Sequence, residues 1–297
     1  MDVFRAAAWA TIVALLIGIL TLVYQIWRDY RTTLDNVARA VSTFSEEGHT
    51  LLLRRDYEGA LAAYRRVLEL DPQSAVAHKN MGNALWELGR HDESIAEHKT
   101  AISLDPTYVE PHIYLGNAYS LLNRWTEAVA EYQQALLLRP QDAYAHCFLA
   151  FSLKELGDTQ RAMTEFETSL ALNPKSIDAR SGLAVIFSDQ GKNREAANLL
   201  REATQLDPNN ASLFHNYGLT LLNLNDYDGA VQALSRSIAL NPKDYLSKYY
   251  LGVSYSHLGK CDEARSALAS YVRMASDVGG EESRLADARK FLGSDEG

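Results

Sequence analysis

Three histidines recur at one interval in the sequence: His78, His112 and His146 are each 34 residues apart. Histidine is a common metal ligand, so the pattern first suggests a metal site. Equivalent residues on successive stacked helix pairs lie about 8–10 Å apart, whereas the ligands of one zinc ion lie within about 4 Å of each other. The interval therefore predicts histidines that pack in a core, as we also expect for His98, and neither a metal nor a cofactor is predicted.

The remaining reactive side chains show no catalytic pattern. Cys147 and Cys261 are too few for a disulfide framework or a cysteine-based zinc site. The sequence contains no nucleophile elbow, phosphate-binding glycine loop or zinc-protease motif. The formal net charge of -9 disfavours contact with a phosphate backbone. We therefore expect that the protein is not an enzyme and that it has no nucleic-acid partner.

The beginning of the chain is apolar. Residues 6–27 contain no charged side chain, and a helix of that length extends about 33 Å, close to the hydrocarbon thickness of about 30 Å. The segment predicts a membrane anchor with short flanks over residues 1–30, followed by a helical linker over 31–40. A cleaved signal peptide is the alternative, although its apolar region would be shorter. Arg28 and Arg31 favour a single-pass membrane protein whose larger part is cytoplasmic, and an extracytoplasmic location stays open.

The prolines reveal an internal repeat. Six of the seven follow one another at intervals of 34 residues: Pro72, Pro106, Pro140, Pro174, Pro208 and Pro242. A leucine stands two residues before each of them, and small residues recur at two further places of the period. Small residues let two helices pack closely and proline ends a helix, so each period predicts a pair of antiparallel helices. Seven such units cover residues 41–278.

The third unit resembles a tetratricopeptide repeat. It carries most of the residues typical of that family: His112, Leu115-Gly116, Tyr119, Ala128, Tyr132, Ala135 and Pro140. The resemblance implies an all-α, right-handed superhelical solenoid of seven helix-turn-helix repeats, preceded here by the transmembrane helix. The expected repeats are 41–74, 75–108, 109–142, 143–176, 177–210, 211–244 and 245–278.

Two places in the pattern carry specific expectations. In most units glycine or asparagine stands between the two helices, where a residue with positive φ ends the first helix. Arg55 occupies this place in the first unit, so we expect a less regular turn there. After the last unit, Leu285, Ala288 and Leu292 lie on one side of an amphipathic segment. Residues 279–297 are therefore predicted to form a capping helix and tail.

The family resemblance also implies a binding surface. In such repeats the first helices line a concave groove, which would take a protein or peptide partner. Asparagine and aromatic side chains at the groove-facing places suit an extended backbone. Any single ring would instead be a core residue if its helix face is misplaced by one residue. The residues assigned to the groove are Lys79, Asn80, Asn83, Trp86, Tyr114, Asn117, Tyr144, Phe148, Phe151, Asn216, Tyr249 and Tyr250, with His215 and His257 beside the last three.

These patterns favour one function and leave others open. The main hypothesis is a membrane-anchored scaffold, attached through residues 6–27, that binds an extended protein segment during assembly or recruitment of a membrane complex. The second is a non-catalytic subunit that presents substrates to a partner enzyme such as a glycosyltransferase. The third is a structural oligomer, and the sequence does not decide the oligomeric state.

Overall fold

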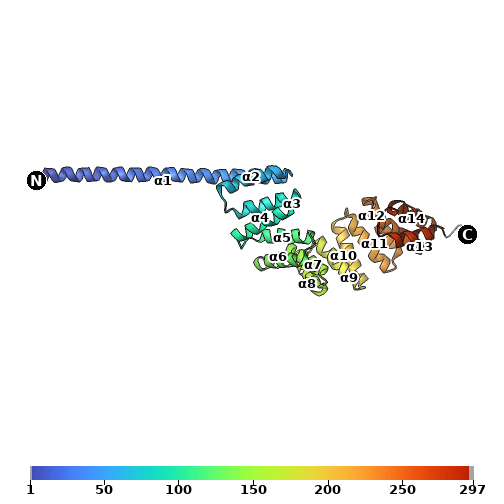
Figure 1. Ribbon diagram of the computed structural model, residues 1–297. Coiled ribbons are helices and arrows are strands. Elements are labelled where there is room, and N and C mark those ends of the chain that lie inside the picture. Colours follow the sequence, from blue (N-terminus) through green and yellow to red (C-terminus); the bar gives the residue numbers. More distant parts are fainter. Residues whose placement is uncertain (1, 294–297) are drawn as a thin grey trace. The chain divides into compact units, whose positions relative to one another are not determined.

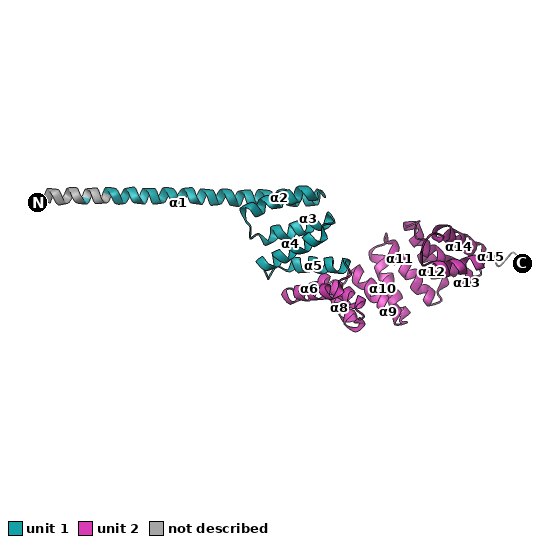
Figure 2. Cartoon of the chain, viewed as in Figure 1, with its two compact units in different colours: residues 1–122 teal, residues 123–297 magenta. Residues whose placement is uncertain are grey.

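The protein is built from helices that form two compact units, residues 1–122 and 123–297 (Figure 2). The computed structural model describes the backbone of residues 2–293, and the side chains of Trp9 and of residues 14–293. Within these residues there are fifteen α-helices and no strand (Figure 1). Unit 1 contains α1 (Asp2–Leu53), α2 (Tyr57–Leu70), α3 (Ala75–Glu87), α4 (His91–Leu104) and α5 (Val109–Leu121). Unit 2 contains α6 (Trp125–Leu138), α7 (Ala143–Glu155), α8 (Thr159–Leu172), α9 (Ile177–Asp189), α10 (Asn193–Leu206), α11 (Ala211–Asn223), α12 (Tyr227–Leu240), α13 (Tyr245–His257), α14 (Cys261–Ala275) and α15 (Glu282–Gly293).

The helix ends follow the periodic residues of the sequence. Helices α2, α4, α6, α8, α10 and α12 each end at the leucine that stands two residues before a recurring proline. Proline has no amide proton and disfavours a helical residue before it, which explains why the helix stops there. Many of the following helices begin with a side-chain cap; Asp142, for example, accepts a hydrogen bond from the Ala145 amide at 3.0 Å.

The turn inside the first hairpin is regular, contrary to the sequence-based expectation. Arg55 has a positive φ, of 61°. The residues at the equivalent places of other hairpins also have positive φ, for example Asn225 at 60° and Gly89 at 75°. The Asp56 amide donates to the Leu51 carbonyl at 2.9 Å, which is the closing bond of a Schellman motif. A non-glycine residue in this conformation costs about 1–2 kcal/mol, and the hydrogen bonds that close the turn hold Arg55 there. The prediction of an irregular turn was therefore wrong.

Large side chains fill one recurring place at the centre of the hairpins. This place lies on the second helix of each pair, and its occupants are no more than 3% exposed: Tyr64, His98, Tyr132, Phe166, Leu200, Leu234 and Leu268. The first helix commonly presents a small residue to it. A Cβ atom added at Gly218 would lie 2.6 Å from Leu234 Cγ, so the absence of a side chain permits this close approach of α11 and α12.

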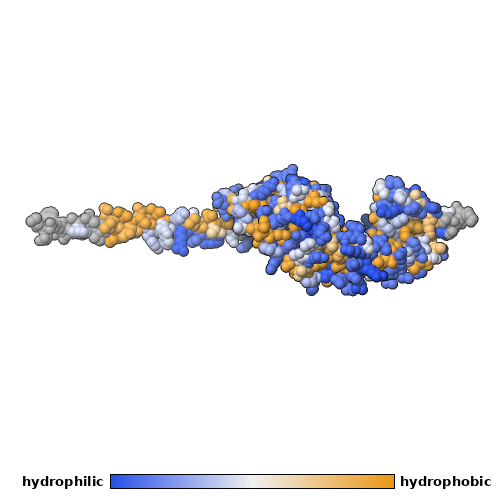
Figure 3. Space-filling model, turned by 90° about the horizontal axis from the view of Figure 1, so that it is seen from below, coloured by the Kyte–Doolittle hydropathy of each residue, from blue (hydrophilic) through white to orange (hydrophobic). Residues whose placement is uncertain are grey.

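Helix α1 is continuous from residue 2 to residue 53, and Val41, Phe44, Leu51 and Leu52 of its C-terminal part pack against the core of unit 1. No helix in the described part of the chain is both long and apolar enough to cross a bilayer. The described apolar residues of α1 give way to charged ones at Arg28 and Asp29. Figure 3 shows this change along α1, from an orange stretch beside the grey residues to a blue one.

This finding corrects two sequence-based predictions. The transmembrane helix over residues 6–27 is not supported, and the localisation as a single-pass membrane protein with a cytoplasmic repeat domain is wrong. Part of the predicted span, the side chains of residues 6–8 and 10–13, lies outside the described residues.

Helix α15 covers the end of the helical array in unit 2. Leu285 and Ala288 are buried against α14, on the side that the sequence pattern indicated. The Glu281 carboxylate is itself buried and accepts hydrogen bonds from the Tyr271 hydroxyl at 2.9 Å and from Arg284 at 3.0 Å. A buried carboxylate with two such donors fixes the start of α15 on the preceding hairpin.

Candidate functional site

Helices α3, α4 and α5 of unit 1, with the ends of α1 and α2, surround a cavity of about 410 Å³. Four residues that the sequence assigned to the groove line it: Asn83 and Trp86 of α3, and Tyr114 and Asn117 of α5. The remaining lining residues are Leu52, Tyr57, Glu87, Ser94, His98, Ala118 and Leu121. Aromatic and aliphatic side chains with a few polar groups are typical of a binding cavity. We refer to it below as the α3–α5 cavity.

The second helix contributes two lining residues that the sequence analysis did not assign to the site. Ser94 and His98 are one turn apart on α4, and they are 0% and 2% exposed. The His98 ring stacks on Tyr114 with centroids 5.3 Å apart and planes at 14°. Burial, with a smaller effect of Lys79, lowers the pKa of His98 to about 4. His98 is thus a neutral imidazole at physiological pH, with one donor and one acceptor nitrogen.

Lys79 and Asn80 lie on α3 outside the cavity lining. Lys79 Nζ donates to Asn80 Oδ1 at 2.7 Å and lies 6.0 Å from the centre of the Tyr108 ring. Burial lowers the pKa of Lys79, and Glu110 opposes this effect. These two residues therefore contact each other, and Lys79 also lies near the N-terminus of α5.

The aromatic residues predicted in the fourth repeat form a connected series in unit 2. The Tyr144 and Phe148 rings are 4.2 Å apart, and Phe148 and Phe151 are 5.9 Å apart. Phe151 meets the fully buried Phe166 edge to face at 4.9 Å. Tyr144 is 46% exposed, whereas Phe148 and Phe151 are half-buried. The series thus extends from the core of the α7–α8 hairpin to its surface.

Near the end of unit 2, Tyr249 and Tyr250 line a second cavity, of about 320 Å³. His257 also lines it and stacks on Tyr227 with centroids 4.4 Å apart. Tyr249 also contacts the buried Tyr271 at 5.1 Å. Asn216 is half-buried on α11, and its carbonyl accepts a hydrogen bond from Thr220.

The recurring histidines make contacts inside their own hairpins. His78 Nδ1 lies 2.6 Å from Glu97 Oε2, and His146 Nδ1 lies 2.5 Å from Glu165 Oε2. His112 is buried. In the described part of the chain, no group of three histidine, cysteine or acidic side chains is placed to hold a metal ion.

A Ser-His-Asp cluster in unit 2 has a structural arrangement. His215 Nδ1 lies 2.7 Å from Ser247 Oγ, and that hydroxyl donates to Asp244 Oδ2 at 2.5 Å. The other Asp244 oxygen caps α13 by accepting from the Ser247 amide. Ser247 is fully buried, and a nucleophile needs an accessible oxygen. The cluster therefore ties α11 to the start of α13.

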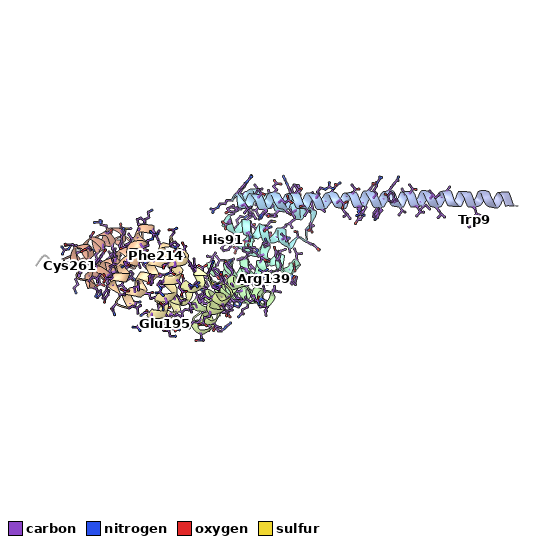
Figure 4. The ribbon with its side chains drawn as sticks, turned by 180° about the vertical axis from the view of Figure 1, so that it is seen from behind. Trp9, His91, Arg139, Glu195, Phe214 and Cys261 are labelled. Atoms are coloured by element: carbon purple, nitrogen blue, oxygen red, sulfur yellow. The ribbon has the colours of Figure 1, made fainter. Side chains whose placement is uncertain are left out.

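Both cysteines are free thiols. Cys147 is buried in α7, and Cys261 is exposed at the start of α14 (Figure 4). His91 marks the equivalent place in unit 1, at the start of α4 (Figure 4). Its ring lies 4.1 Å from that of Trp86.

Comparison with protein families explains this architecture. Models described as TPR repeat match residues 48–89, 82–123 and 116–157. Models described as tetratricopeptide repeat match residues 153–216, 187–247 and 247–275. The chain is a tetratricopeptide repeat protein. The predicted count of seven repeats and their boundaries go beyond these matches and stay predictions.

Individual relatives of this tetratricopeptide repeat protein are distant. A TPR repeat-containing protein of Borreliella burgdorferi is 29% identical over 65 residues, which are 22% of this chain and 28% of that protein. The match thus spans less than a third of the curated relative.

Solved structures share the fold. A tetratricopeptide repeat protein from Parabacteroides merdae matches with a TM-score of 0.63 and 14% identity over 84% of this chain and 99% of its own. Pseudomonas aeruginosa PilF matches with a TM-score of 0.64 and 19% identity, over 76% and 99%. YrrB, described as a TPR protein with an unusual peptide-binding site, matches with a TM-score of 0.51 and 22% identity, over 62% and 95%. These similarities establish an all-α tetratricopeptide repeat solenoid.

Proposed function

We propose that this protein is a scaffold that binds an extended segment of another protein along the first helices of its repeats and so assembles or recruits a protein complex. The observation that carries the proposal is the α3–α5 cavity. Four residues assigned to the groove from sequence, on two successive first helices, line this one cavity. We also propose that the repeats number seven and extend over residues 41–278.

The chemistry of the surface supports a peptide as the ligand. Trp86, Tyr114 and Tyr57 offer large ring areas at low cost in side-chain entropy. Asn83 and Asn117 offer amide groups that can pair with a peptide backbone. The peptide-binding site for which YrrB is described is a precedent on the same fold. In unit 2, the exposed ring of Tyr144 would extend the same kind of contact.

The proposal is tested by comparing what the full chain and its variants retain from a cell extract, measured by quantitative mass spectrometry. Trp86→Ala should remove a discrete set of proteins that the wild type retains, and Phe148→Ala tests the aromatic series of unit 2 in the same way. Val76→Ala is the matched control, because Val76 is on α3 and 53% exposed but does not line the cavity. Recovery of every protein at wild-type levels by the Trp86 variant would refute the groove assignment.

A further inference from the structure

We infer that the α3–α5 cavity receives an uncharged carboxamide side chain, from asparagine or glutamine, of the bound segment. This inference rests on the proposed function and specifies the ligand of the same site. Three buried polar atoms of the lining residues have no hydrogen-bond partner: Asn83 Oδ1, Ser94 Oγ and His98 Nδ1. Buried polar atoms are almost always paired in native proteins, so three unpaired ones at one cavity indicate a group that the site is built to bind.

The three residues line one cavity at a point where α3 and α4 approach closely. Gly82, next to Asn83, has no side chain, and a Cβ atom there would lie 2.7 Å from His98 Nε2. Ser94 and His98 occupy the same face of α4, since they are four residues apart. All three residues are held by packed helices and not by loops, so their relative positions are fixed before a ligand arrives.

A primary carboxamide complements this set of atoms. Asn83 Oδ1 accepts a hydrogen bond, and His98 Nδ1 accepts one when the imidazole proton is on Nε2. The Ser94 hydroxyl can donate. A carboxamide has two N–H donors and a carbonyl acceptor in one plane, which matches two acceptors and one donor.

Charge distinguishes the carboxamide from ionised side chains. The described residues that line the cavity include one carboxylate, Glu87, and no lysine or arginine. A bound carboxylate would therefore meet Glu87 and find no counter-ion among the described lining residues. A bound ammonium would enter surroundings that already disfavour positive charge, as the lowered pKa of His98 shows. The Glu87 carboxylate accepts a hydrogen bond from the Tyr57 hydroxyl at 3.1 Å.

Entry of the ligand requires a side-chain movement. The Tyr114 ring covers His98 and is itself 37% exposed. A rotation of this ring toward solvent would uncover the His98 ring without moving the backbone, and rotamer changes of this kind are common on binding.

The test uses the full chain and pools of 11-residue peptides that are randomised at every position except the central one. That central residue is glutamine, leucine, lysine, glutamate or N,N-dimethylglutamine, the last of which lacks both N–H donors. Binding is measured by fluorescence anisotropy. The glutamine pool should bind about fivefold to tenfold more tightly than the leucine and dimethylglutamine pools.

The variant Ser94→Ala separates binding from folding. It removes an unpaired buried hydroxyl, so the thermal unfolding temperature should not fall, whereas the preference for the glutamine pool should drop at least threefold. Ser103→Ala is the matched control on the exposed end of the same helix and should change neither quantity. Pools that bind the wild type and lose binding in Trp86→Ala, but show no preference for glutamine, would overturn the carboxamide inference alone. A preference for the lysine or glutamate pool, or a glutamine preference that survives Ser94→Ala, would also overturn it. Absence of binding by every pool would overturn both this inference and the proposed function.

Discussion

Acidification is expected to destabilise the α3–α4 hairpin through His98. The pKa of this residue is about 4 in the folded chain and about 6.5 in an unfolded one. Because the folded value is the lower of the two, the unfolded chain takes up the proton first. The stability is therefore fully present above about pH 6.5 and is lost as the pH falls toward 4. From these two values, the free energy of opening falls by about 2 kcal/mol between pH 7 and pH 5, and by about 3 kcal/mol at pH 4.

The measurement is hydrogen exchange of the α4 amides, which reports the free energy of local opening. The comparison is with His98→Leu, since leucine occupies the equivalent buried place as Leu200, Leu234 and Leu268. Carboxylate titrations are common to both proteins and cancel in the difference. Between pH 7 and pH 5, the free energy of opening should fall by about 2 kcal/mol more in the wild type than in the variant. Parallel pH profiles for the two proteins would contradict the assignment of a buried neutral histidine.

Two further outcomes follow from packing. Gly218→Ala should lower the free energy of unfolding by about 1–2 kcal/mol, because the clash with Leu234 outweighs the better helix propensity of alanine; Gly18→Ala, which meets no atom within 4 Å, should cause no loss in thermal denaturation. A maleimide should label Cys261 in the native chain and Cys147 only after denaturation, since Cys147 is buried and burial raises the pKa of its thiol to about 12. Labelling of Cys147 in the native chain, detected by peptide mass spectrometry, would contradict this account.

The helical architecture was predictable because local signals at the helix ends agree with the hydrophobic pattern. The recurring prolines and the leucines before them fix where second helices end. Arg55 shows the limit of such reasoning. The preference of single residues predicted an irregular turn, but the hydrogen bonds of the whole turn impose a positive φ on arginine as well.

The cavity was predicted in part. Asn83, Trp86 and Tyr114 line one cavity because their first-helix places follow from the repeat, and their role in binding a partner stays a prediction. Ser94 and His98 were missed, since their second-helix places are packing positions in the other units. The one available signal was the identity of His98 itself, a polar ring at a place that tyrosine, phenylalanine or leucine fills elsewhere.

The apolar beginning of the chain was misinterpreted. Absence of charge over residues 6–27 was taken to indicate a transmembrane helix, yet no described helix meets the required length and apolarity. Residues 31–40, predicted as a helical linker, lie within α1, which is one helix to Leu53.

The short sequence separation of the packing partners has a kinetic consequence. Gly218 and Leu234 are 16 residues apart, as are Gly252 and Leu268, and His146 is 19 residues from Glu165. Contacts of such low order form within microseconds to milliseconds, whereas a ribosome needs about 2–7 s to add 34 residues. During synthesis each hairpin therefore has time to form before the next one emerges, so the nascent chain exposes little more than one incomplete hairpin to aggregation at any moment.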